Sequence, residues 1–531
     1  MNKQRSPKLK RGALLSGLAF LVFLVPTVGA QSPPPWPTAV VTPAPAATPV
    51  ATPTPAPTEI PPIPSPTPVA QGAEEQTSAT APPADVEEAG STTVSPSPTP
   101  AAETGEDGEK LDKSEIVTNP GEMAFTDYQP FDLDEIEPEA IKTKWGNFVA
   151  AVRGLSRYTL FDGKLKFRIG GRAQIDGTVG SGDTTYDVVY GPIESKFGVR
   201  RLGIYSAGRF NKFNFNIEFE VGPDWGLSDA WIEGSEGGLE VWGAYLGKLR
   251  LGFMNEPFSL ERQTSSYNTG FMERSLPVQT IAPGSNIGWM VHDSGRKGRF
   301  SWAFGMFSFG QSSEQNASAS SLSLTGRFTH LLTYRDEGRK LIHLGVSVSS
   351  RSPTGGDLQY RSRPEARFVD FLVDTGNFDV GHVRLSDLEF AAVQGPLWVA
   401  AEYIQSDVSA QAVGDPKFSG SYVQVGWFLT GESRPYRTNS GTFERLRPTT
   451  KYTKGNPFRK RNGGAWEVVG RLSTIDLTEG LVEGGELTDF SASLNWYINA
   501  TSRLEFNFIH ASPKDRGSAN IFLMRLQFQP W

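Results

Sequence analysis

The chain has 531 residues, of which 38% are apolar and 21% are charged, and it contains no cysteine and five histidines. The lack of cysteine excludes a disulfide scaffold, a thiolate metal site and a cysteine nucleophile. The formal net charge of −7 is unevenly distributed: residues 31–141 carry two basic and 19 acidic residues, whereas residues 142–531 carry 44 basic and 39 acidic ones. No apolar run of 18 residues follows residue 30, which excludes a bundle of transmembrane helices.

Residues 1–30 have the three-part layout of a secretory signal peptide. Five basic residues lie within the first 11 positions, residues 13–25 are apolar, and Val28-Gly29-Ala30 supplies the small residues that precede a cleavage point at Gln31. The alternative is an uncleaved membrane anchor, but this apolar stretch is short for a bilayer, which needs roughly 20 residues. The sequence therefore predicts that the mature protein is exported.

The next two segments have too few apolar residues to form a folded core. Residues 31–102 are rich in Pro, Thr and Ala, and residues 31–100 hold 20 of the 39 prolines and one aromatic residue. Such a segment cannot bury a core, and its prolines favour an extended conformation, so we expect a disordered linker. Residues 103–140 are strongly acidic and are expected to form a solvated, mostly irregular segment.

From about residue 164 onward, apolar and polar residues alternate with a period of two, which is typical of β-strands. Residues 213–221, 342–349 and 504–508 show this alternation clearly. Tight connections are predicted at 336–338, 394–396 and 499–502, and longer polar stretches at 312–321 and 351–367. Short turns that alternate with longer loops indicate an up-and-down antiparallel sheet.

The apolar side of this sheet carries large Phe, Leu and Trp side chains, and the polar side carries many charges and amides. A secreted sandwich or propeller would also alternate, but one sheet formed by residues 141–531 would be large for a sandwich. A lipid-facing band around a wet interior explains both faces. We therefore predict an all-β fold, a transmembrane antiparallel up-and-down β-barrel of about 16 strands in the bacterial outer membrane, with the N-terminal arm in the periplasm.

The interior of such a barrel is an aqueous channel whose selectivity depends on its lining. Residues 142–531 contain 30 Arg and 14 Lys, and Arg168 and Arg172 fall on the polar face. Arginine suits phosphate and carboxylate because it offers a planar fork of donors. The alternative is that these arginines pair with the acidic residues. The adjacent Arg200 and Arg201 can both face the interior only if the strand contains a bulge.

The segment 252–266 departs from the two-residue period, and its charges and hydroxyls are interleaved with Pro and aromatic residues. A long non-strand loop of a barrel either caps the mouth or folds inside. An inward loop would bring Arg262, Ser265 and Ser266 to a constriction, where a low dielectric strengthens contacts with an anion.

The region from Ile141 to the C-terminus resembles a known family, the phosphate-selective porins of bacterial outer membranes. This family implies a 16-stranded barrel, usually a homotrimer, with an arginine-lined pore, the third loop folded inward, and no catalysis. The motifs that carry the resemblance occur in one order: Ile141-Lys142-Thr143-Lys144, Gly170-Gly171-Arg172-x-Gln174-x-Asp176, Arg200-Arg201, Pro257-Phe258-Ser259-Leu260-Glu261 with Thr264-Ser265-Ser266, Glu273-Arg274, His343-Leu344-Gly345, Leu429-Thr430-Gly431-Glu432-Ser433-Arg434, Gly464-Ala465-Trp466-Glu467, Asn495-Trp496-Tyr497 and Met524-Arg525-Leu526-Gln527.

The resemblance implies that Arg200 and Arg201 are paired pore arginines and that Arg262 stands where a central binding lysine is expected. The resulting set of predicted anion-binding or pore-lining residues is Arg168, Arg172, Arg200, Arg201, Asp229, Arg262, Ser265, Ser266, Arg274 and Arg363. In two places the chain departs from the pattern: Glu365 and Val369 replace arginines, and residues 486–489 replace lysines. These departures imply a weaker set of cationic groups.

The predicted function is a passive channel for phosphate, polyphosphate or other small anions. A general or otherwise selective porin is the alternative, and the Pro-rich arm could also tether the envelope through contact with the cell wall. An enzyme is not expected, because the chain has no Gly-x-Ser-x-Gly motif and its histidines are scattered. No metal, cofactor or nucleic-acid partner is expected.

Overall fold

The computed structural model describes residues 157–223, 225–234, 238, 240–241, 244–295, 297–309, 321–353, 357–450 and 463–529. These residues belong to the second of two compact units, Glu109–Trp531. The predicted signal peptide (1–30), linker (31–102) and acidic segment (103–140) lie outside the described residues, as does the first family-like motif at 141–144. Their boundaries therefore stay predictions.

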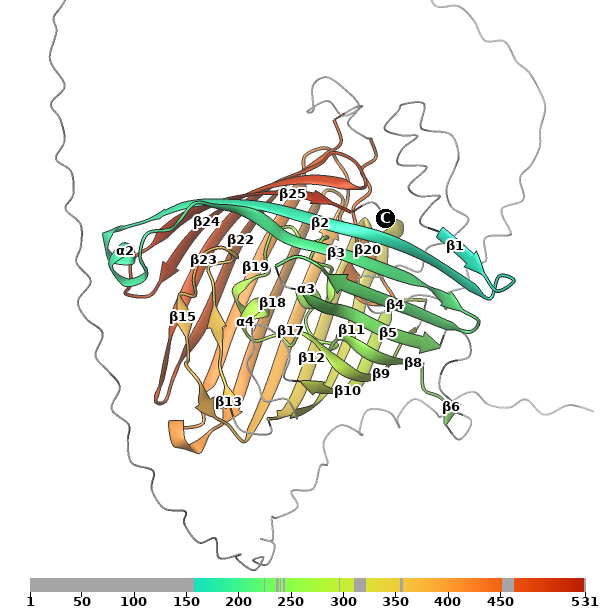
Figure 1. The fold of residues 1–531 in the computed structure, drawn as a ribbon, viewed down its shortest axis with the longest axis horizontal. Coiled ribbons are helices and arrows are strands. Elements are labelled where there is room, and N and C mark those ends of the chain that lie inside the picture. Colours follow the sequence, from blue (N-terminus) through green and yellow to red (C-terminus); the bar gives the residue numbers. More distant parts are fainter. Residues whose placement is uncertain are drawn as a thin grey trace, which may run out of the picture. The chain divides into compact units, whose positions relative to one another are not determined.

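Sixteen antiparallel strands form a closed barrel, which confirms the predicted fold. The ring closes because β2 pairs with β3 along one edge and with β25 along the other (Figure 1). In order around the ring, the strands are β2 (Leu165–Gly182), β3 (Lys196–Phe210), β4 (Phe213–Glu220), β5 (Gly226–Gly234), β8 (Lys248–Asn255), β9 (Ser285–Gly295), β10 (Phe300–Phe309), β11 (Ser321–Arg335), β12 (Lys340–Ser352), β17 (His382–Gln394), β18 (Leu397–Ser409), β19 (Lys417–Phe428), β22 (Ala465–Glu479), β23 (Val482–Tyr497), β24 (Ser502–Pro513) and β25 (Ala519–Phe528).

Shorter elements lie at the edge of the barrel and in its connections. The strand β1 (Arg157–Leu160) forms a hairpin with the start of β2, and two-residue strands pair as β6 (Glu240–Val241) with β7 (Ala244–Tyr245), β13 (Asp357–Leu358) with β16 (Phe378–Asp379), β14 (Arg361–Ser362) with β15 (Val373–Asp374), and β20 (Tyr436–Arg437) with β21 (Thr442–Phe443). Among the described residues, the helices are α2 (Thr184–Tyr190), α3 (Leu260–Gln263), α4 (Leu276–Thr280) and the 3₁₀ turns η1 (Asp336–Gly338) and η2 (Gln411–Val413). Within the described ranges, no helix combines the length and the apolar character needed to cross a bilayer.

The alternating residues of the strands face two different environments. On β12, Leu344 and Val346 are 41% and 42% exposed on the outer surface, whereas Ser347 and Ser349 are 1% exposed and face the interior. Outward apolar side chains recur around the ring, for example Ile217 on β4, Leu388 on β17 and Phe522 on β25. The barrel therefore presents an apolar band outward and a polar lining inward, as a lipid-facing barrel requires.

The two ends of the barrel differ in their connections. The predicted tight turns at 336–338, 394–396 and 499–502 all lie at the end where β2 begins, which we call the short-turn end. Longer connections, including 183–195 and 353–381, lie at the opposite, long-loop end. Two connections at the short-turn end are longer: residues 235–247, between β5 and β8, and residues 429–464, between β19 and β22.

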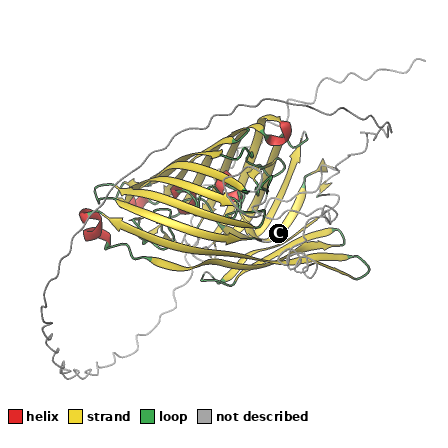
Figure 2. Cartoon of the chain, turned by 90° about the horizontal axis from the view of Figure 1, so that it is seen from above, coloured by secondary structure: helices red, strands yellow, loops and turns green. Residues whose placement is uncertain are grey.

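Several connections fold into the interior of the barrel (Figure 2). Residues 256–284, which join β8 to β9 and include α3 and α4, fold inside and are called the inward loop. Phe258 and Leu276 of this loop are fully buried, which confirms the predicted inward folding. The predicted start of the non-strand segment at Gly252 is wrong, because β8 continues to Asn255. The strand β8 pairs with β5 only as far as Phe253. Its pairing with β9 continues to Asn255, so backbone hydrogen bonds to β9 keep the last residues of β8 extended.

An N-cap fixes the connection between β2 and β3. The carboxylate of Asp183 accepts hydrogen bonds from the backbone N–H groups of Tyr186, at 2.9 Å, and of Ser518, at 2.7 Å. The N–H of Tyr186, assisted by Ser518, holds the pKa of the exposed Asp183 carboxyl below its usual range. This stabilising contact is therefore present at neutral pH and is lost as the pH falls through the lowered pKa.

Gly426 on β19 provides the space for an indole ring inside the barrel. A Cβ at this position would lie 2.2 Å from atoms of the Trp398 ring. We expect Gly426→Ala to lower the free energy of unfolding by about 1–3 kcal/mol, because the buried ring must shift. The midpoint of heat denaturation in detergent measures this loss. Gly470→Ala on β22 is the matched control, since its Cβ would meet no atom within 4 Å; equal losses in both variants would contradict the packing.

Candidate functional site

Two adjacent arginines on β3 both face the interior of the barrel. The register shifts here, because Gln174 of β2 pairs with Arg201 while the next residue, Ile175, pairs with Val199. Arg200 is therefore the extra residue of a β-bulge. The flanking Val199 and Leu202 point outward, 40% and 43% exposed, whereas Arg200 is buried. The bulge that the sequence requires for this pair is present.

The inward loop is anchored where it leaves β8. The carboxylate of Glu402 on β18 accepts hydrogen bonds from the backbone N–H groups of Leu260, at 3.0 Å, and Glu261, at 2.7 Å, at the start of α3. The hydroxyl of Ser259 accepts from the backbone N–H of Arg262 at 3.0 Å. These contacts position α3 against the wall and place Arg262 on the side of the loop that lines a cavity.

The tip of the inward loop is held by its backbone carbonyl groups. Five of them accept hydrogen bonds from side chains of the opposite wall or of the connection 429–464: Tyr267 from Gln527 (2.9 Å), Asn268 from Arg434, Thr269 from Arg503 (2.8 Å), Gly270 from Asn495 (2.9 Å) and Met272 from Arg525. The loop therefore crosses the lumen and is fixed at both its start and its tip.

A cavity of about 720 Å³ lies between β3, the inward loop and the connection 353–381, and we call it the cationic cavity. Hydroxyl groups of Ser266 and Thr269 contribute to its wall. Its charged lining consists of five arginines and two glutamates, namely Arg200, Arg201, Arg262, Arg274, Arg367, Glu220 and Glu273. This excess of guanidinium groups is the donor set that phosphate and carboxylate prefer.

Glu273 balances part of this positive charge. It accepts hydrogen bonds from Arg200 at 2.8 and 3.0 Å and from Arg525 at 2.8 Å. Arg201 differs, because it donates to the amide oxygen of Gln174 at 3.3 Å and forms no ion pair within the described part of the chain. Arg201 therefore leaves most of its five N–H donors available to a solute.

Arg274 lines the cationic cavity but also braces the inward loop. Its Nη2 donates to the carbonyl oxygens of Arg262 and Thr264, each at 2.9 Å. These bonds hold the turn that follows α3, so the predicted Arg274 has a structural contact in addition to its place in the wall. Ser266, another of the predicted site residues, lies in the same wall.

Five of the predicted site residues do not line the cationic cavity: Arg168, Arg172, Asp229, Ser265 and Arg363. Arg172 forms an ion pair with Glu218 at 2.9 Å, and both Arg172 and Arg168 lie over the ring of Tyr205, at 4.9 and 5.4 Å from its centroid. These two arginines belong to the buried lining of β2 at a distance from the cavity wall.

The other three predicted residues make local contacts. The Asp229 carboxylate accepts hydrogen bonds from Asn216 at 2.6 Å and Trp231 at 2.9 Å. Buried Ser265 accepts a 3.3 Å hydrogen bond from the backbone N–H of Tyr267. Arg363 lies over the ring of Phe371, 3.9 Å from its centroid, and donates to the carbonyl of Val369.

Many interior arginines form ion pairs, which is the alternative that the sequence left open. The pairs, with their distances, are Arg250–Glu233 (2.6 Å), Arg327–Glu389 (2.7 Å), Arg351–Glu256 (3.0 Å), Arg434–Glu467 (3.6 Å), Arg471–Glu261 (3.2 Å), Arg503–Glu505 (3.2 Å) and Arg525–Asp176 (2.7 Å). These arginines tie strands and loops together. The cationic cavity differs from these paired positions by its excess of positive charge.

Three acidic residues stand where the family pattern leads us to expect arginine or lysine. Two of them form ion pairs with other side chains. Glu365 forms an ion pair with Arg471 of β22, and Glu486 forms one with Lys514. Asp489 is fully buried, and neither of its carboxylate oxygens has a hydrogen-bond partner among the described residues. None of these three acids lines the cationic cavity, so its excess of arginine is preserved.

Three buried carboxylates, of Asp387, Glu389 and Glu402, place oxygen atoms within 4.8 Å of one another. Arg327 already binds Glu389, and the inward loop binds Glu402. This arrangement works as an anchor between β17, β18 and the inward loop.

Three residues in the wall of the cationic cavity were not predicted from the sequence, namely Arg367, Thr269 and Glu220. Arg367 and Thr269 lie in connections, where no two-residue period indicates the direction of a side chain. Glu220 is the last residue of β4. It falls on the polar face of the strand, as the other acidic residues of the lining do, so the sequence did not single it out.

The family model described as "Phosphate-selective porin O and P" matches residues 167–529. The chain belongs to this family. Porin O of Pseudomonas aeruginosa is 25% identical to it over 411 residues, which cover 70% of this chain and 86% of that protein. An uncharacterized protein of Caulobacter vibrioides is 30% identical over 175 residues, which cover 32% of this chain and 34% of that protein.

Solved porin structures also match this porin. The anion-selective porin from Comamonas acidovorans superposes with a TM-score of 0.43 and 13% identity, over 69% of this chain and 99% of that chain. Family membership and the closed barrel make this protein an outer-membrane porin, a channel. Since porins have short periplasmic turns and longer external loops, the short-turn end of this porin faces the periplasm.

Proposed function

We propose that this porin is an anion-selective channel that favours phosphate and that the cationic cavity is its selectivity site. The observation that carries the proposal is the lining of that cavity, where five arginines outnumber two glutamates. The alternative, a general porin whose arginines are all neutralised by acids, is supported by the ion pairs elsewhere in the lumen. The excess charge in the cavity favours the selective channel.

The arginines of the cavity have different roles in this proposal. Arg201 and Arg262 supply the guanidinium groups that contact the anion, and Ser266 and Thr269 supply hydroxyl donors. Arg200 is held by Glu273, so it contributes a fixed positive charge beside the site. Several contacts of moderate strength recruit an anion and still release it, which conduction requires.

The predicted Arg168 and Arg172 take a secondary role. They lie in the lining of β2 above Tyr205, where they add positive potential along the path. Arg363, Ser265 and Asp229 act through local contacts that shape the loops and the wall. We therefore assign the direct contacts with the solute to the residues of the cavity.

Planar-bilayer recordings of the purified protein test the proposal. In a chloride gradient the reversal potential is expected to show that chloride permeates better than potassium, and millimolar phosphate is expected to block the chloride current. Equal permeability of the two ions would remove the proposed anion selectivity. Anion selectivity without block by phosphate would remove only the preference for phosphate.

We further propose that the porin assembles as a homotrimer through the wall formed by β4, β5 and β8. These strands have 8, 9 and 8 residues, at or below the roughly 9–11 residues that a strand needs to cross a bilayer. A low wall of this kind favours contact with protein over contact with lipid. The mass of the detergent-solubilised protein tests this proposal, and a monomer under mild conditions would contradict it.

A further inference from the structure

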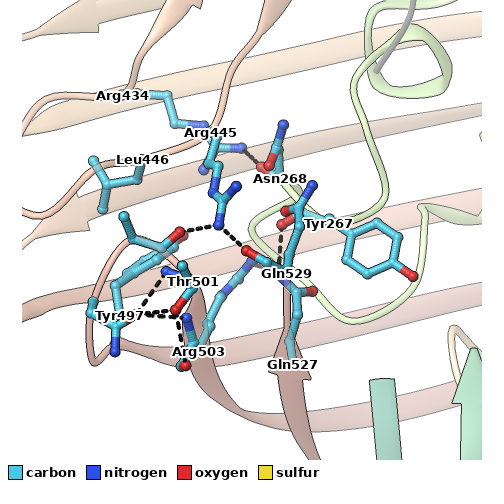
Figure 3. Close-up of a pocket in the computed structure, with 13 residues that line it drawn as sticks. Tyr267, Asn268, Arg434, Arg445, Leu446, Tyr497, Thr501, Arg503, Gln527 and Gln529 are labelled. Carbon is cyan, nitrogen blue, oxygen red and sulfur yellow. Dashed lines mark hydrogen bonds between the residues drawn. The ribbon is translucent and has the colours of Figure 1, made fainter. Parts of the chain in front are cut away.

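A second, smaller cluster of arginines lies at the short-turn end of the barrel, on the far side of the inward-loop tip. Arg434 and Arg445 come from the connection 429–464, and Arg503 comes from β24. All three line one small cavity, together with the turn between β23 and β24 and the end of β25 (Figure 3). None of the 13 residues that line it is acidic.

The charges around this small cavity do not balance. Arg434 lies 3.6 Å from Glu467, and Arg503 lies 3.2 Å from Glu505, so each has one carboxylate partner. Arg445 has no carboxylate partner among the described residues. Its Nη2 donates to two backbone carbonyl oxygens, those of Ala500 and Gln529, as the dashed lines in Figure 3 show. The cluster therefore carries one uncompensated positive charge.

Two of these arginines also have buried donors without acceptors. Arg434 and Arg503 are each 3% exposed, and the Nε atom of each is buried without a hydrogen-bond partner in the part of the chain that the structure describes. A buried N–H group without an acceptor is destabilising, and more so in a charged group. An acceptor that carries one negative charge would satisfy both the donors and the charge.

The size of the cavity restricts that acceptor. It offers about 20 Å³ to the centre of a water-sized occupant, against the roughly 10–15 Å³ that one water requires on the same measure. A single monatomic anion fits this space, whereas phosphate, with its four oxygens around a central atom, is too large.

We propose that this cavity binds one halide ion, chloride under ordinary conditions, between Arg434, Arg445 and Arg503. The ion completes the contact between the connection 429–464 and the tip of the inward loop, to which Arg434 and Arg503 already donate. This site is separate from the cationic cavity and shares none of its arginines. Its role is structural: it holds two inward segments together at the periplasmic end.

Heat denaturation of the purified full-length protein in detergent tests the site. At a constant ionic strength of about 0.1 M, replacing gluconate by chloride or bromide is expected to raise the midpoint by a few degrees, in a manner that saturates with halide concentration. Arg445→Gln is expected to abolish this halide dependence. Arg339→Gln, at an exposed arginine of the β11–β12 turn, is the matched control and is expected to retain it.

Anomalous diffraction from crystals grown in bromide provides the second measurement, and a bromide peak is expected among the three guanidinium groups. Equal midpoints in halide and gluconate, halide dependence that survives in Arg445→Gln, or the absence of this peak would each overturn the proposal. Arg445→Gln is expected to keep the reversal potential of the parent. The outcome is therefore distinguishable from a failure of the proposed anion selectivity.

Discussion

Arg201→Glu is expected to lower the ratio of anion to cation permeability by roughly tenfold or more. A unit charge 4 Å from a permeating anion contributes about 4 kcal/mol at an effective dielectric constant of about 20, and about 1.4 kcal/mol already corresponds to a tenfold change. Because Arg201 forms no internal ion pair among the described residues, its replacement removes the charge without leaving a buried carboxylate unpaired. Reversal potentials in planar bilayers measure the ratio.

Two variants control this experiment. Arg201→Lys keeps the positive charge and is expected to retain anion selectivity, with weaker block by phosphate because lysine lacks the planar fork. Arg339→Glu makes the same change of charge at an exposed turn and is expected to leave the ratio nearly unchanged at about 1 M salt, where screening extends over about 3 Å. If Arg201→Glu selects anions as well as the parent does, Arg201 does not contact the permeating ion.

Arg471→Met is expected to destabilise the protein by about 3–5 kcal/mol and to increase the noise of the open channel. Arg471 of β22 donates to Glu261 of the inward loop at 3.2 Å and also forms an ion pair with Glu365 of the connection 353–381. It also lies over the ring of Phe271, 4.1 Å from its centroid. Its removal leaves two buried carboxylates without their common cation and releases two segments that shape the pore.

A combined variant tests whether the lost ion pairs cause this effect. Arg471→Met together with Glu261→Gln and Glu365→Gln removes the charges of both partners and is expected to recover part of the stability, because neutral groups tolerate burial better than unpaired charges. Heat denaturation in detergent and single-channel noise are the two measurements. If the combined variant is less stable than Arg471→Met, the two unpaired carboxylates are not the cause of the destabilisation.

Much of the fold could be predicted from the sequence because a strand encodes its two faces locally. The alternation in residues 342–349 places Leu344 and Val346 outward and Ser347 inward, and tight turns mark where one strand ends and the next begins. The same rule predicted the bulge, since Arg200 and Arg201 could both enter the lumen only through an irregular register. Local geometry was sufficient for these features.

The contents of the lumen could not be predicted in the same way. A period of two gives the face of a side chain but not its partner across the barrel, so the pairing of Arg172 with Glu218, or of Arg471 with Glu365, has no local signal. Residues 429–450 of the connection between β19 and β22 were not expected to enter the lumen, because their polar composition also suits a solvated loop. Arg445 of this connection and Arg367 of the connection 353–381 were missed because no two-residue period indicates where a side chain of a connection points.

The most direct test of the account is to locate an anion inside the open channel. Crystals of the porin soaked in arsenate, a tetrahedral analogue of phosphate with strong anomalous scattering, would mark the site where the solute binds. We expect a peak in the cationic cavity within hydrogen-bond distance of Arg201 and Arg262. Arsenate bound elsewhere in the lumen, with this cavity holding only water, would contradict it.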